Sequence, residues 1–137
     1  MRFALLDTNV YIDFWVGGLH ADVVEAAHRS FVVRHAAVVL SELRRGARTQ
    51  QARRTVESLY RLATEVWEPS AADWWQVGTL VRDVGDQQGW DVSKRREFQN
   101  DALLALMARR RGAVVITSDR TDFELLEPGV GVRVKYL

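Results

Sequence analysis

The feature that most constrains the fold is the alternation of short apolar runs with longer segments of helical spacing. Five short runs rich in β-branched or apolar residues predict strands, and the clearest is Ala113 to Thr117. In chain order, we expect strands at 2–6, 31–33, 65–67, 113–117 and 130–136, and helices at 8–16, 21–30, 36–45, 49–63, 70–86, 94–111 and 118–126. Strands that alternate with helices predict an α/β layered fold with a mainly parallel sheet.

Composition indicates an ordinary globular chain of one domain, residues 1–137. The 137 residues are 47% hydrophobic and 27% charged, and they contain no cysteine. The absence of cysteine excludes disulfides and thiolate catalysis, and it fits a reducing cytoplasm. The apolar stretch Phe3 to Leu6 is too short for a signal peptide, and no run approaches the ~20 residues that span a bilayer. We therefore expect a cytoplasmic protein with no membrane segment.

Two acidic residues follow predicted strands directly. Asp7 ends the first strand, and Asp119 lies two residues beyond Thr117. Functional groups of parallel α/β sheets gather outside the carboxyl ends of the strands, so these two acids are expected at one edge. Each of them is also a candidate N-cap for the helix that follows, and capping does not exclude metal binding.

Three further acids lie on helices that can reach this edge. Asp101 stands in the nearly apolar segment Asn100 to Ala108, where a buried charge is costly unless it is paired or metal-bound. It is therefore either the solvent-side residue of its helix or a ligand for a cation. Glu42 follows the strand at 31–33, although an isolated Glu on a helix is usually solvated. Asp122 follows Asp119 by one helical turn and could equally be a ligand or a surface acid.

Carboxylates that converge at one edge repel one another unless a hard cation neutralises them. Mg²⁺ prefers oxygen ligands, and Mn²⁺ is expected to substitute for it. One or two such ions can lower the pKa of water and stabilise the charge that develops in phosphodiester hydrolysis. This chemistry needs neither cysteine nor histidine. Clustered arginines are usually solvated, but Arg44 and Arg45 flank Glu42 and are the preferred phosphate-binding pair.

Four motifs in order resemble those of PIN domains. They are Leu5 to Val10, Ser41 to Gly46, Asn100 to Ala105 and Val115 to Phe123. Their order and spacing, together with the chain length, are similar to the VapC toxins of bacterial VapBC toxin–antitoxin modules. The resemblance covers essentially the whole chain and implies a PIN-like three-layer α/β/α fold. Residues 50–97 match no motif, and we expect substrate choice to depend on them.

The resemblance also implies an activity and a site. It implies a divalent-metal endoribonuclease that dimerises and is inhibited by a cognate antitoxin protein. Asp7, Glu42, Asp101 and Asp119 would be the metal-binding acids, with Asp122 as an auxiliary ligand. The polar groups expected to support these acids or contact phosphate are Thr8, Asn9 and Ser118. Which RNA is cut is not implied.

Three other functions compete with this one. A phosphatase of the haloacid-dehalogenase type would need a second Asp at the position of Asn9, and no suitably placed lysine is evident. A non-catalytic RNA- or protein-binding module would be favoured if one acid of the set were missing, and none is. A housekeeping nuclease of the same fold in RNA processing stays open, because a fold does not determine a substrate.

Overall fold

The computed structural model describes residues 2–137, which form five strands and seven helices. The strands are β1 (Phe3–Leu6), β2 (Val32–Ala36), β3 (Val66–Trp67), β4 (Ala113–Thr117) and β5 (Arg133–Tyr136). The helices are α1 (Thr8–Gly17), α2 (Ala21–Ser30), α3 (Ala37–Gly46), α4 (Gln50–Leu62), α5 (Ala71–Gln88), α6 (Val92–Arg111) and α7 (Arg120–Val130). Every element expected from the sequence is present.

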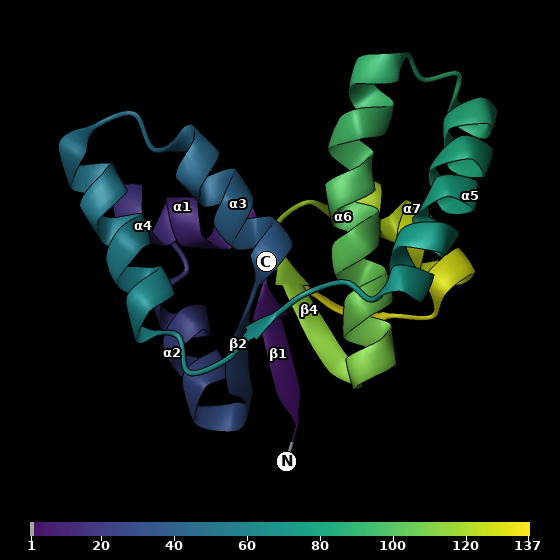
Figure 1. Ribbon diagram of the computed structural model, residues 1–137. Coiled ribbons are helices and arrows are strands. Elements are labelled where there is room, and N and C mark those ends of the chain that lie inside the picture. Colours follow the sequence, from purple (N-terminus) through teal and green to yellow (C-terminus); the bar gives the residue numbers. More distant parts are fainter. Residues whose placement is uncertain (1) are drawn as a thin grey trace.

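The strands form one sheet in the order β3-β2-β1-β4-β5, and all neighbouring pairs are parallel. In the view of Figure 1, α1 to α4 lie to the left of the strands and α5 to α7 to the right. The prediction of a three-layer α/β/α fold with a mainly parallel sheet is confirmed. Residues 2–137 contain no helix with the length and apolar character needed to cross a membrane.

Helix α6 is the central support of the fold. Its residues Ala102 to Ala108 are all buried, and α6 contacts β4, α3, α5 and α7. A helix that is apolar around most of its circumference is stable only when it is surrounded in this way. The helix starts at the N-cap Asp91 and ends at Gly112, whose φ of +69° is easily adopted only by glycine. Asp101 is consequently held on a rigid element.

Three segment boundaries lie three or more residues from those expected, at the end of β2, the end of α7 and the start of β5. Strand β2 continues past Val33 because the polar Arg34 is half-buried, with its guanidinium 5.6 Å from the Phe3 ring centre and 3.7 Å from Glu65. Helix α7 runs past Leu126 and includes Pro128, ending at the left-handed Gly131. Strand β5 therefore begins at Arg133 rather than at Val130. Helix α5 begins with a capping box formed by Ser70 and Asp73.

Candidate active site

The acidic residues lie at the point where the strand order of the sheet reverses. Strands β1 and β4 are neighbours, but the chain leads from β1 toward β2 and β3, and from β4 toward β5. Such a switch point leaves a crevice at the carboxyl ends of the two strands. The backbone N–H of Asp7 donates to the carbonyl of Ile116 at 2.9 Å, which continues the pairing of β1 with β4. Asp7 and Asp119 therefore meet at one edge, as the strand pattern predicted.

Asp7 is held by three hydrogen bonds. Its side chain is 3% exposed and accepts from the Thr8 N–H at 2.8 Å, the Thr117 hydroxyl at 2.8 Å and the Asn9 amide at 3.1 Å. The first bond makes Asp7 the N-cap of α1, so the capping role is real. Burial raises the pKa of Asp7, although these hydrogen bonds act in the opposite direction.

Thr117 is a site residue that the sequence analysis missed. Its hydroxyl is fully buried, donates to Asp7 and accepts from the Asp119 N–H at 2.9 Å. It thus connects the two acids that follow β1 and β4. The available signal was a hydroxyl at the end of an otherwise apolar strand.

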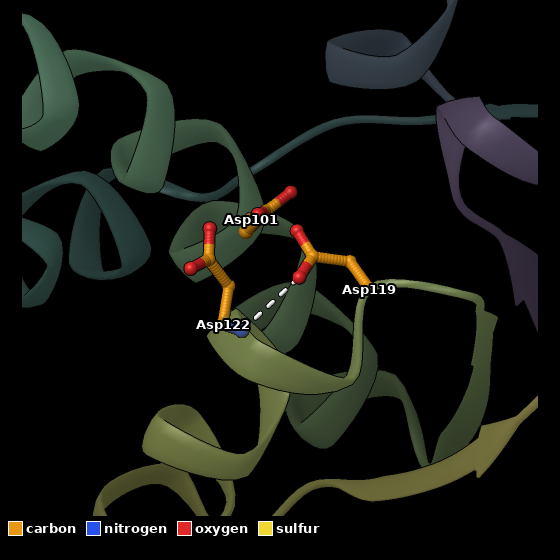
Figure 2. Close-up of side chains that lie close together, drawn as sticks. All are labelled: Asp101, Asp119 and Asp122. Carbon is orange, nitrogen blue, oxygen red and sulfur yellow. Dashed lines mark hydrogen bonds between the residues drawn. The ribbon is translucent and has the colours of Figure 1, made fainter.

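Asp101, Asp119 and Asp122 form the acidic trio shown in Figure 2. One carboxylate oxygen of each lies within 4.8 Å of the others, and Asp119 caps α7 by accepting from the Asp122 N–H at 3.1 Å. Burial, followed by the charge of Asp7 and the nearby carboxyls of the trio, raises the pKa of Asp101 to about 10. Asp101 therefore faces other acids rather than open solvent.

Asp122 has a cationic partner. It is 3% exposed, and both of its carboxylate oxygens lie 3.0 Å from the Lys94 ammonium. The interpretation of Asp122 as a surface acid is therefore wrong, because α7 packs this side chain against α6. The statement that no suitably placed lysine is evident is also wrong. The missed signal is that Lys94 precedes Asp101 by seven residues, which places both on one face of α6.

Glu42 lies on the Asp7 side of the site. It is half-buried on α3 and accepts from the Thr8 hydroxyl at 3.2 Å. Burial and the charge of Asp7 raise the pKa of Glu42, while Thr8, Arg45 and Asn100 lower it. Glu42 is outside the trio but shares the electrostatic environment of Asp7.

The remaining polar candidates differ in their contacts. Asn9 connects to Asp7 and also accepts from the Ser118 N–H at 3.1 Å, while the Ser118 side chain is exposed. The Arg45 charge acts on Glu42, whereas Arg44 lies 3.4 Å from Glu57 of α4. Of the two arginines expected beside Glu42, Arg45 is thus the one with an electrostatic effect on it.

The donor set fits a small divalent cation. Carboxylate oxygens are the ligands that Mg²⁺ prefers, and a Mg–O distance of about 2.1 Å separates opposite ligands by about 4.2 Å. The trio offers three such oxygens that lie within 4.8 Å of one another, so they would have to approach one another slightly to share one ion. Asp101 in addition is a poorly compensated acid that a cation would stabilise.

Comparisons with known proteins identify the fold. The chain is similar to a chain of VapBC2 from Rickettsia felis, whose structure contains a DNA fragment from the promoter. The TM-score is 0.73, with 18% identity and 99% coverage of both chains. VapBC-1 from nontypeable Haemophilus influenzae gives a TM-score of 0.72, 20% identity and 98% coverage of both. VapBC-5 from Mycobacterium tuberculosis, a member of the VapBC family of toxin–antitoxin systems, gives a TM-score of 0.62, with 23% identity and 100% coverage of both chains. No match is found among curated proteins.

The family model of the PIN domain matches residues 4–126. This range contains all four motifs quoted above and every acid of the site. PIN domains are generally nucleases. The resemblance inferred from the motifs is confirmed, and the chain belongs to the PIN domain family.

Proposed function

We propose that the protein is the toxin of a type II toxin–antitoxin pair and acts as a metal-dependent endoribonuclease. The observation that carries this proposal is the convergence of acids from β1, α3, α6 and β4 at the switch point of a PIN domain. Its metal-binding acids are Asp7, Glu42, Asp101 and Asp119. The likeness in fold to chains of VapBC structures, at identities of 18–23%, supports the toxin role.

Mg²⁺, or Mn²⁺ in its place, would supply the Lewis acidity that phosphodiester hydrolysis needs and would lower the pKa of water. Asp101 and Asp119 would hold this ion, and Asp7 would complete the set from β1. The buried Thr117 hydroxyl orients Asp7 and the backbone of Asp119 together. Such preorganisation matters, because small displacements of catalytic groups lower rates steeply.

The cationic side chains would position the RNA. Arg45 lies near enough to Glu42 to lower its pKa, so it is placed to neutralise a phosphate at the edge of the site. Thr8, Asn9 and Ser118 surround Asp7 and present polar groups to the same edge. Arg44 would have to leave Glu57 before it could contact phosphate, and its 78% exposure leaves it free to do so.

An antitoxin would inhibit the protein from an apolar groove beside the acids. The groove has a volume of about 360 Å³, and its lining includes Ile12, Trp15, Val16 and Leu43, with Glu42 at the acidic side. Val16 and Ile12, both in the lining, are 84% and 44% exposed, and they offer an apolar surface that a partner could cover. A peptide segment in this groove would lie against Glu42 and block access of RNA.

A homodimer is also part of the proposal. Trp74 and Trp75 on α5 are exposed over 51% and 85% of their surfaces. Exposed tryptophans are typical of interfaces, because each buries a large area at low entropic cost. Light scattering of the antitoxin-free protein, compared with Trp75→Ala, tests this point. Equal masses for both proteins at the dimer value would place the interface elsewhere, and a monomeric wild type would refute the dimer.

The activity is tested by incubating cellular RNA with purified antitoxin-free protein in Mg²⁺, Mn²⁺ or EDTA. Asp101→Asn removes one ligand at nearly constant volume, and Asp83→Asn is a matched control at an exposed acid of α5. We expect discrete cuts by the wild type and the control that need metal and disappear in Asp101→Asn. Absence of cleavage by all folded proteins would contradict the nuclease and favour a binding module. Cleavage by Asp101→Asn at the wild-type rate would contradict the site.

A further inference from the structure

Lys94 is a cation built into the acidic site. Its ammonium lies 3.0 Å from both carboxylate oxygens of Asp122, and the same ammonium lies 5.0 Å from the centre of the Trp90 ring. Trp90 in turn packs edge-on against the buried Phe98, with ring centres 4.9 Å apart. The lysine side chain is therefore anchored at two points, and its position is fixed by α6 and α7.

The carboxylate of Asp122 is thereby already paired with a cation, the Lys94 ammonium. A carboxylate that accepts from an ammonium with both oxygens has its charge compensated, and only 3% of its surface is exposed. A divalent ion bound by Asp122 would lie close to the Lys94 charge and would be repelled by it. Asp122 therefore differs from Asp101 and Asp119, which belong to the same trio but lack such a contact with Lys94.

We infer that Lys94 removes Asp122 from the metal-binding set and limits the site to one divalent ion. This inference rests on the proposed metal site of the nuclease. With Asp7 and Glu42 assigned to the set that holds the first ion, a second ion would need Asp122 together with Asp101 or Asp119, and these three acids approach one another within 4.8 Å. Lys94 supplies a monovalent positive charge at the place where that second ion would bind. Lys94 is thus a positioning residue that sets the number of ions.

The test counts the Mn²⁺ ions bound per chain by titration, with electron paramagnetic resonance of the free ion as the readout. Lys94→Met keeps the length of the side chain and removes its charge. Arg96→Met is the matched control, because Arg96 is an exposed cation on the same helix. We expect one ion for the wild type, one for Arg96→Met and two for Lys94→Met.

A double variant distinguishes the loss of the Lys94 charge from a loss of folding. Lys94→Met leaves the buried Asp122 without its partner, which can destabilise the protein. Lys94→Met combined with Asp122→Asn removes both charges, and it should bind one ion because the second ligand set has lost a carboxylate. Circular dichroism verifies that each variant is folded.

The outcomes separate this inference from the proposed function. Two ions bound by the wild type, or one ion bound by folded Lys94→Met, would overturn the role of Lys94 while leaving the metal site in place. An unchanged count of two in the double variant would likewise exclude Asp122 as the added ligand. No Mn²⁺ bound by any of the proteins would refute the metal site itself, and the inference with it.

Discussion

Asp7 and Asp101 lie at the same edge of the sheet, and burial raises the pKa of both, but hydrogen-bond donors oppose this shift only at Asp7. Asp7 accepts hydrogen bonds from Thr8, Asn9 and Thr117. For Asp101, burial and the neighbouring acids all disfavour the anion, and its pKa is raised to about 10. One half of the site is therefore organised by the fold itself. The other half is complete only when a cation is bound, and this difference makes the two halves experimentally distinguishable.

Asp119 and Asp122 of the trio also differ in how their charges are compensated and held in place. Asp122 has the ammonium of Lys94, whereas Asp119 serves as the cap of α7 and keeps its place through the Thr117 hydroxyl. Two acids of the same trio thus have different partners. Substitutions of Asp119 and Asp122 should have the largest effects, on the rate of RNA cleavage. Smaller effects are expected on thermal stability.

Asp119→Asn should lower kcat/KM for RNA cleavage about 1000-fold or more, because it removes a metal ligand while asparagine preserves the cap. Asp122→Asn should lower it only about 10–100-fold, as expected for a residue outside the ligand set. Cleavage of a fluorogenic RNA that contains a wild-type cut site measures both rates. Equal losses in the two variants would place Asp122 among the ligands and abolish the distinction.

Divalent metal should stabilise the protein against heat. Mn²⁺ at one hundred times its Kd contributes about 2.7 kcal/mol to the free energy of unfolding, which raises Tm by about 6–10 °C for a chain of this size. Asp101→Asn should lose this shift, and Asp83→Asn should keep it. Differential scanning calorimetry with and without EDTA provides the measurement. A full shift in Asp101→Asn would mean that the ion binds elsewhere.

Asp101→Asn should also stabilise the metal-free protein. The folded chain keeps a proton on Asp101 up to a pKa of about 10, whereas the ordinary value is 3.8. Since the folded state binds the extra proton, the free energy of unfolding contributed by this group falls as pH rises between these two values.

In EDTA at pH 8, we expect Asp101→Asn to raise Tm by about 3–10 °C, or about 1–3 kcal/mol, with a smaller gain at pH 5. Thermal melts of the wild type and Asp101→Asn at the two pH values measure this difference in Tm. A variant that melts below the wild type at pH 8 would show that Asp101 is not the strained member of the site.

Thr117→Val should have the smallest effect, a fall in Tm of about 3–7 °C in EDTA, or about 1–2 kcal/mol. The substitution preserves shape but removes the hydroxyl that serves Asp7 and the Asp119 N–H. Thr79→Val, at an exposed position of α5, is the matched control and should change little. If both variants melt like the wild type, hydrogen bonding at Thr117 does not hold the Asp7 half of the site.

The sequence by itself determined the order of strands and helices and the family. Apolar periodicity, capping residues and the left-handed glycines at helix ends are local signals, so they are legible without tertiary contacts. The same holds for Asp7 and Asp119, because residues that follow parallel strands must share an edge. The motifs around Glu42 and Asp101 added the other two acids.

Only the tertiary structure decided how these acids divide into two groups. Lys94 and Asp122 are 28 residues apart, and they meet because α6 packs against α7. Arg44 turns to Glu57 because α3 packs against α4, which no spacing rule within one helix indicates. Burial at position 101 depends likewise on the elements that surround α6. Charge pairing and desolvation are properties of side chains brought together from distant segments, so they become visible only in the folded protein.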